Sequence, residues 1–269
     1  EPDAVWQSKP AGRKAAGKVA AGKMAGTKAR PRKPAQAKLP DFIAPQLCRG
    51  LERPPAGAGW AHEIKLDGYR LQLRVAAGGA TLKTRKGLGW TKRFGAIAKA
   101  AAGLPDALID GEVVALDEGG APDFAALQAA LSEGRTRDLV YFAFDLLFAD
   151  GEALRDLPLG ERKTRLRALL EGADARLRFL DHFETAGDAV LRSACKLSLE
   201  GIVSKRLDAP YRSGRGDTWT KSKCRAGHEV VIGGWATTNG RFRSLLVGVH
   251  RGAHFVHVGR VGTGYGAAK

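Results

Sequence analysis

The composition of the chain changes abruptly near residue 40, and this break decides which part can fold. Residues 1–40 hold ten Lys or Arg against Glu1 and Asp3, so they contribute +8 of a net charge of +16. The segment is rich in Ala, Gly and Pro in a near five-residue repeat, which buries too little apolar surface to fold. We therefore expect a flexible basic linker over 1–40 and a folded region after it.

Short runs typical of strands dominate the sequence after residue 40. The β-branched, aromatic or alternating runs lie at 60–66, 69–75, 80–84, 107–116 and 139–148. Patterns typical of helices lie at 92–102, 123–132, 160–171 and 185–197. Since strands and helices do not alternate regularly, the sequence predicts an α+β domain of mostly antiparallel sheets over 41–226.

A second pattern begins after Lys223. Three strand-like runs, at 228–236, 244–250 and 253–261, are separated by turns that contain glycine. Consecutive short strands of this kind are typical of a small β-barrel such as the OB-fold, which has five strands. We therefore interpret 227–269 as the incomplete beginning of an OB-fold.

Charge, hydropathy and cysteine usage exclude several classes of protein. No apolar run approaches the roughly 18–20 residues of a membrane-spanning helix, and residues 1–40 lack the apolar region of a secretory signal. A sequence pI near 10.1 favours nucleic acid or another polyanion as partner. Three cysteines without a CxxC pair predict reduced thiols in a cytosolic protein.

Five short motifs carry residues with distinctive chemistry: HEIKLDGYR, LIDGEVV, YFAFDLL, EGIVSKR and TWTKSKC. In the first, Lys65 follows an alternating strand and could act as a nucleophile in its neutral form, although taken alone an exposed hairpin explains it better. In the second, Asp110 and Glu112 interrupt an apolar strand, where carboxylates need a cation, a ligand or backbone donors. In the last, Lys221 and Lys223 point to one face of a strand, and a bound phosphate would relieve their repulsion.

In this order, the five motifs resemble those of the covalent nucleotidyltransferases, which include ATP-dependent DNA ligases, RNA ligases and mRNA capping enzymes. The resemblance spans about 63–223 and, with TRKGLGWTKRF at 84–94, is closest to the ligase domain of the bacterial DNA ligase D family. That family joins DNA ends together with Ku, and flexible linkers connect its ligase domain to phosphoesterase and polymerase domains. The resemblance implies a nucleotidyltransferase domain followed by an OB-fold.

The resemblance also implies roles around the nucleotide. Lys65 would attack the α-phosphorus of ATP and carry AMP. Glu63 would bond to the adenine, and Phe144 would stack on it. Arg70 and Glu112 would hold the ribose and phosphate region.

Further roles concern phosphate, metal and DNA. Lys221 and Lys223 would grip the α-phosphate, and Glu200 would bind the catalytic Mg or Mn. Arg85 would contact the 5′-phosphate of the nick. Lysines and a divalent metal suit this chemistry because phosphoryl transfer depends on positioning and on charge neutralisation.

The sequence therefore predicts an ATP-dependent DNA ligase that seals nicks or ends in duplex DNA through lysyl-AMP and AMP–DNA intermediates. The implied setting is double-strand break repair by a monomer in the bacterial cytoplasm. Two alternatives remain at this point: an RNA ligase or capping-type enzyme, and a non-catalytic DNA-binding scaffold. The scaffold alternative predicts that no AMP adduct forms under any condition.

Overall fold

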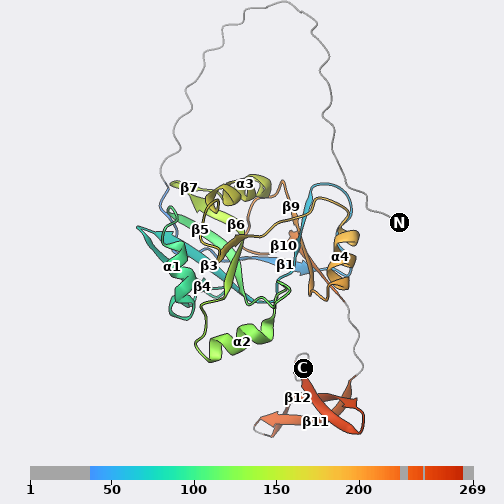
Figure 1. The fold of residues 1–269 in the computed structure, drawn as a ribbon. Helices are drawn as coiled ribbons and strands as arrows, with labels where there is room; N and C mark the ends of the chain where they lie inside the picture. The colour runs from blue at the N-terminus through green and yellow to red at the C-terminus, as the bar shows by residue number, and fades with distance from the viewer. Residues whose placement is uncertain (1–36, 225–229, 239, 263–269) are drawn as a thin grey trace, which may run out of the picture. The chain divides into compact units, whose positions relative to one another are not determined.

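The computed structural model describes residues 37–224, 230–238 and 240–262 (Figure 1). Residues 1–36, which make up most of the predicted linker, lie outside this range. The described chain is folded from its first residues. The backbone N–H of Ala37 donates to Gly151 O at 2.7 Å, and Leu39 packs against a buried apolar cluster.

A six-stranded sheet forms the centre of the domain. Its strands are β3 (Tyr69–Ala76), β4 (Gly79–Thr84), β5 (Ala107–Val114), β6 (Val140–Ala149), β7 (Glu152–Ala153) and β8 (Leu177–Phe179). The order is β4-β3-β5-β6-β7, all antiparallel, and β8 adds to β6 in parallel. β5 and β6 are buried along almost their whole length, which explains their continuous apolar sequence.

A second, four-stranded sheet covers one face of the first. It contains β1 (Gln46–Gly50), β10 (Gly214–Lys223), β9 (Gly201–Arg206) and β2 (Trp60–Ile64) in that order, and β1–β10 is its parallel pair. Trp219 and Tyr211 pack there against Phe144 and Leu147 of β6. The opposite face of the six-stranded sheet is covered by helices, through Ile97, Leu127 and Leu166 among others.

The helices are a 3₁₀ turn (Thr91–Phe94), α1 (Gly95–Ala101), α2 (Phe124–Ser132), α3 (Leu159–Leu169) and α4 (Gly187–Lys196). Figure 1 shows α3 beside β6 and α4 beside β9. Each falls within two residues of a predicted helix, and the Asp123 side chain caps α2 by accepting from the Ala126 N–H at 2.9 Å. Among the described residues, no helix is long and apolar enough to cross a membrane.

A separate three-stranded sheet follows, built from β11 (Val231–Thr238), β12 (Arg241–Arg251) and β13 (His254–Val261). Both pairings are antiparallel, so the meander expected for the first strands of an OB-fold is present. Residues 228 and 229 of the first predicted strand lie outside the described residues. Across 230–238 and 240–262 the sheet remains open and does not close into a barrel.

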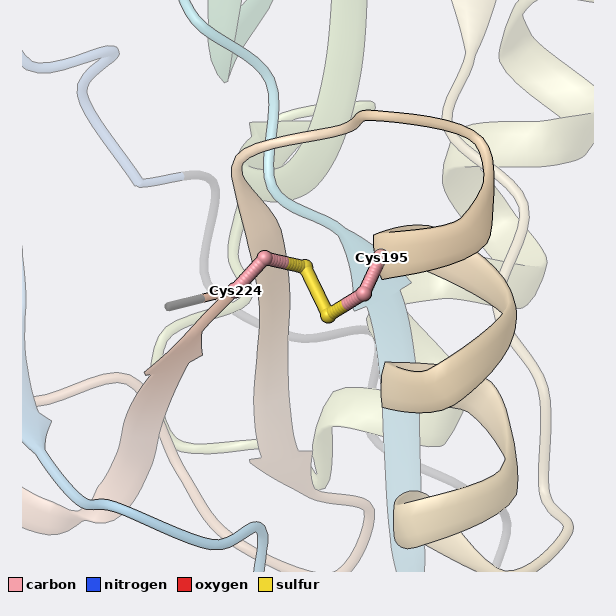
Figure 2. Close-up of a disulfide and its surroundings, with 2 residues drawn as sticks. All are labelled: Cys195 and Cys224. Atoms are coloured by element: carbon pink, nitrogen blue, oxygen red, sulfur yellow. A yellow bond between two sulfur atoms is a disulfide. The ribbon is translucent and has the colours of Figure 1, made fainter. Parts of the chain in front are cut away.

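The prediction of reduced thiols is wrong for two of the cysteines. Cys195, in the last turn of α4, forms a disulfide with Cys224, just after β10, with 5.3 Å between their Cα atoms (Figure 2). The two lie 29 residues apart in sequence, but both flank β9, a proximity that cysteine spacing does not reveal. Cys48 is a free thiol, and burial raises its pKa.

Candidate active site

A pocket of about 220 Å³ is lined by residues of both central sheets. β2 and the residues just after it supply one wall, while β3, β5 and β6 of the larger sheet supply another. Seven of the nine residues that the sequence analysis singled out line this pocket: Glu63, Lys65, Arg70, Arg85, Glu112, Phe144 and Lys221. Segments up to about 160 residues apart in sequence therefore bring the predicted residues to one place.

Of the other two predicted residues, Glu200 forms an ion pair with Lys65, and Lys223 forms one with Glu200. Lys65 Nζ contacts one carboxylate oxygen of Glu200, and Lys223 Nζ contacts the other at 2.7 Å. We call these three residues the outer cluster. Burial opposes the ionised form of Glu200, but the two lysines outweigh it and lower its pKa. Their side chains are 20% (Lys65), 24% (Glu200) and 55% (Lys223) exposed, so water and ligands can reach the cluster.

Glu200 and Lys65 are held together by the backbone as well as by charge. The backbone N–H of Lys65 donates to Gly201 O at 2.9 Å, and that of Cys224 donates to Glu200 O at 3.0 Å. Gly201 has φ +145°, and a Cβ there would lie 2.2 Å from Ser222 O. The glycine of the EGIVSKR motif is therefore required by the close approach of β9 and β10.

A second charged group lies deeper, and we call it the inner cluster: Glu63, Lys163 and Lys205. One oxygen of Glu63 lies 2.5 Å from Lys163 Nζ, and the other lies 2.6 Å from Lys205 Nζ. All three side chains are 2% exposed. Burial alone would raise the pKa of Glu63, but the two lysines lower it overall. Glu63 faces the same side of β2 as Lys65, as residues two apart on a strand do.

Arg70 is anchored by its own partners. Its Nε and Nη2 donate to the two oxygens of Asp110 at 3.1 and 2.7 Å, and Nη1 donates to Gln46 O at 2.7 Å. The Tyr211 hydroxyl also donates to Asp110, at 2.7 Å. Burial works against the charge on Arg70, but Asp110 outweighs it and raises the pKa of the guanidinium. The guanidinium is thus charged and fixed at the pocket wall.

Glu112 lies opposite Arg70 in the β3–β5 pairing. Burial raises the pKa of Glu112 to about 7, against the lowering effect of Lys65 and Arg70, and the negative charge of Glu200 adds to the rise. Between Asp110 and Glu112, a Cβ on Gly111 would lie 2.4 Å from Tyr141 Cζ. The glycine of the LIDGEVV motif therefore lets the two acids face the site while Tyr141 packs behind them.

Phe144 lines the pocket but shares its surroundings with other residues. Lys205 Nζ lies 4.1 Å from the Phe144 ring centroid, and the Trp219 ring meets it edge to face at 6.0 Å. Phe144 itself is 6% exposed. A base that contacts Phe144 would therefore also meet Lys205 or Trp219, two residues for which the motifs predicted no role.

The remaining basic residues lie toward the surface. Arg85 follows β4, is exposed, and also borders a neighbouring hollow with Lys86 and Trp90. Lys221 lines the main pocket and, with Lys223, a further hollow beside Glu52. Positive charge therefore extends outward from the pocket, where a phosphate backbone could follow it.

The described residues contain no group of three or more His, Cys, Asp or Glu placed to hold a metal ion. Glu112 and Glu200 nevertheless supply carboxylates beside Lys65, and the positive charge of Lys65 favours the ionised form of both. Mg²⁺ is commonly held by one or two carboxylates together with substrate phosphates. The donor set therefore fits a metal that binds together with a nucleotide.

The sequence did not indicate that Lys163 and Lys205 pair with Glu63 in the inner cluster. Lys163 lies on α3, outside every motif, and nothing in its helical pattern distinguishes it from a surface lysine. Lys205 is the penultimate residue of the EGIVSKR motif, and its position two residues after Val203 on β9 could have suggested that it faces the pocket.

Comparison with known proteins agrees with the motifs. The family described as ATP dependent DNA ligase domain matches residues 48–223. The chain is 46% identical over 239 residues to the multifunctional non-homologous end joining protein LigD of Pseudomonas aeruginosa, covering 86% of this chain and 28% of that protein. It is 36% identical to LigD of Mycobacterium bovis, covering 83% of this chain and 30% of that protein. The chain thus spans less than a third of the length of these relatives.

Solved structures lead to the same family. A mycobacterial DNA ligase D complexed with ATP and MES superposes with a TM-score of 0.64 at 33% identity, covering 83% of this chain and 73% of that one. A Lig E DNA ligase shares the fold, with a TM-score of 0.59 at 21% identity. The resemblance inferred from the motifs is confirmed, and the chain belongs to the ATP-dependent DNA ligase domain family.

Proposed function

We propose that this chain seals nicks or ends in duplex DNA, using ATP and Lys65 as the nucleophile. The observation that supports this most strongly is the position of Lys65 in a pocket with Arg70, Glu112 and Lys221. Neutral Lys65 Nζ would attack the α-phosphorus, forming an N–P bond while the P–O bond to pyrophosphate breaks. AMP would then pass to the 5′-phosphate of the DNA, and the 3′-hydroxyl would displace it as the phosphodiester forms.

The charges around Lys65 suit both the resting and the reacting state. Its pair with Glu200 holds the ammonium in place, and Lys65 must leave this pair and lose a proton before it attacks. Lys221, Lys223 and Arg70 would neutralise the α-phosphate. Glu200, with Glu112, would hold Mg or Mn together with the nucleotide phosphates, and the metal would offset their negative charge. Glu63 and Phe144 would contact the adenine, and Arg85 the 5′-phosphate.

The decisive experiment incubates the chain with ATP and Mg²⁺ and locates the adduct by mass spectrometry. AMP on Lys65, followed by sealing of nicked DNA, is the expected result. An adduct on another residue would contradict the role of Lys65. Sealing of nicked RNA in preference to DNA would favour an RNA ligase, and absence of both adduct and sealing would favour a DNA-binding scaffold.

We also propose that the basic segment over 1–40 adds non-specific affinity for DNA. Its charge of +8 should release counterions from the duplex, so its removal should reduce the slope of log affinity against log salt. A truncated chain that starts at residue 37 keeps Lys38 and therefore loses +7 of this charge, and it tests the role by titration of duplex DNA at several salt concentrations. An unchanged slope would contradict the role.

The relatives' role in non-homologous end joining suggests the wider setting. We propose that the chain works as a monomer in bacterial double-strand break repair in the cytoplasm, alongside Ku and within a longer protein that carries polymerase and phosphoesterase domains. Co-purification of the full-length protein with Ku on duplex ends would test the partnership. Size-exclusion chromatography would test the oligomeric state.

A further inference from the structure

Lys163 reaches the inner wall of the pocket from an element that no motif covers. Its ammonium lies 2.5 Å from Glu63 Oε1, donates to Leu180 O at 2.9 Å, and lies 4.6 Å from the centroid of the Phe179 ring. The side chain is 2% exposed and does not line the pocket itself. A buried charge of this kind is costly unless it is fully paired, so its partners indicate its role.

The group that Lys163 holds does line the pocket. A carboxylate has about four acceptor sites, so Glu63 keeps acceptor capacity after Lys163 and Lys205 have each taken one oxygen. Without those cations a carboxyl group buried this deeply would take up a proton and become a donor as well. The two lysines hold the pKa of Glu63 below its ordinary value in spite of burial, so Glu63 stays an acceptor only.

We propose that Lys163 is a positioning residue that keeps Glu63 as a fixed, ionised acceptor and thereby sets the preference of the pocket for a 6-amino purine over a 6-oxo purine. The inference rests on the proposed function, in which Glu63 contacts the base of ATP. A 6-amino group donates to a carboxylate. A 6-oxo group would place a second acceptor against it with no proton between them, which is unfavourable in a buried site.

Lys163 tests this idea more cleanly than Lys205. Lys205 Nζ lies 4.1 Å from the centroid of the Phe144 ring and 4.2 Å from that of Trp219, and it lines the pocket. Its substitution would change contacts with the nucleotide directly. Lys163 hydrogen-bonds to Glu63 and to Leu180 O and does not line the pocket, so an effect on base selectivity would come through these two groups and through its charge beside Lys205.

The experiment compares adduct formation on Lys65 with ATP and with ITP, whose base carries a 6-oxo group, as kcat/KM for each nucleotide. Lys163→Met removes the charge, and Lys163→Gln replaces it with a neutral donor. We expect the ATP/ITP ratio to fall at least about tenfold in both variants, because the 6-amino group loses its hydrogen bond to a charged acceptor. The change should appear mainly in the KM for ATP.

The matched control is Arg162→Met. Arg162 is the neighbouring residue on α3, is fully buried, and pairs with Asp145 at 2.7 and 2.9 Å; neither Arg162 nor Asp145 lines the pocket. Its loss should lower the melting temperature but leave the ATP/ITP ratio unchanged. An equal fall in the ratio for Arg162→Met would show that any damage to α3 suffices and would overturn the proposal.

Two further results would also overturn it. One is a wild-type ratio in Lys163→Gln, the milder variant, which remains informative if Lys163→Met does not fold. The other comes from a protein that already carries Glu63→Gln. There, adding Lys163→Met should change the ATP/ITP ratio less than about twofold, because the two residues act as one unit. A fall in the ratio as large as in the wild-type background would overturn the proposal. By contrast, absence of any adduct with ATP in the unmodified chain would contradict the proposed function and not the role of Lys163.

Discussion

The inner and outer clusters contain the same residue types in very different surroundings. Each consists of one glutamate held between two lysines, Glu63 between Lys163 and Lys205, and Glu200 between Lys65 and Lys223. The inner side chains are nearly inaccessible to solvent, whereas those of the outer cluster are one-fifth to one-half exposed. Burial, more than charge, therefore distinguishes the two groups.

This difference determines what each cluster can do. A buried ion pair cannot exchange its partners for water without leaving an uncompensated charge, so the inner cluster is a fixed part of the wall. An exposed pair gains little from its attraction, because water screens it and can replace either partner. Lys65 can therefore leave Glu200, as the proposed nucleophilic role requires, whereas Glu63 keeps its lysines throughout.

The largest expected effect comes from Lys65, the proposed nucleophile in the outer cluster. Lys65→Ala should abolish the AMP adduct, a loss of more than about a thousandfold, while folding and DNA binding persist. Lys65→Arg should do the same, because a guanidinium stays protonated and is a poor nucleophile. Mass spectrometry of the ATP-treated variants, with circular dichroism to check folding, would measure this. Wild-type adduct levels in either variant would show that another residue reacts.

Removing each glutamate tests the contrast directly. Glu63→Ala leaves two buried lysines unpaired and should reduce the free energy of unfolding by about 3–5 kcal/mol. Glu200→Ala leaves its two lysines partly in water and should cost less than about 1 kcal/mol, while it slows adduct formation strongly. Urea titration of both variants gives the comparison. Equal destabilisation by the two substitutions would mean that burial does not separate the clusters.

The sequence allowed the outer cluster to be predicted far better than the inner one. Lys65, Glu200 and Lys223 lie inside motifs, and the period of two along a strand places Glu63 and Lys65 on one side. Lys163, one of the two partners of Glu63, could not be found in this way, since it is 100 residues distant and only the packing of α3 against the sheets brings the two together. The Cys195–Cys224 disulfide was missed for the same reason, because contacts between distant elements leave no local pattern.

The short edge strands were also not predicted. β1 (QLCRG) and β8 (LRF) are three to five residues long and show no alternation. Each pairs in parallel with its neighbouring strand, so no hairpin turn in the sequence indicates where it lies. Their positions depend on the partner strands β10 and β6, which lie far away in the sequence.

The disulfide should support the outer cluster alone. It ties α4 to Cys224, next to Lys223, whose neighbour in the cluster is Glu200. Cys195→Ser should cost about 2–4 kcal/mol, because the bridge closes a loop of about 29 residues in the unfolded chain. Adduct formation should slow a few-fold while the ATP/ITP ratio stays at its wild-type value. Thermal unfolding with and without reductant would measure the first effect, and a changed ratio would show that the inner cluster depends on the bridge too.

The smallest expected effect concerns Glu112, whose pKa is shifted in the opposite direction to those of Glu63 and Glu200. Burial raises the pKa of Glu112 to about 7, above the ordinary value of 4.5 expected in the unfolded chain, whereas Glu63 and Glu200 are shifted downward. The folded state therefore binds the Glu112 proton more tightly. Its contribution to stability is complete below about pH 4.5 and is lost as the pH rises to about 7.

Glu112→Gln removes this titration, so the variant should gain stability relative to wild type between about pH 4.5 and 7. Above about pH 7 the difference in the free energy of unfolding should stay constant. The gain should be about 2 kcal/mol or less, because partial exposure weakens the penalty of burying the charge. Glu63 and Glu200 contribute in the opposite sense, since their stabilisation is present above their ordinary pKa and lost in acid. Urea unfolding of wild type and Glu112→Gln across this pH range provides the measurement. If the difference in the free energy of unfolding between the two proteins does not change from pH 4.5 to 8, the pKa of Glu112 is not raised. Glu63, Glu112 and Glu200 would then all be ionised when the reaction begins.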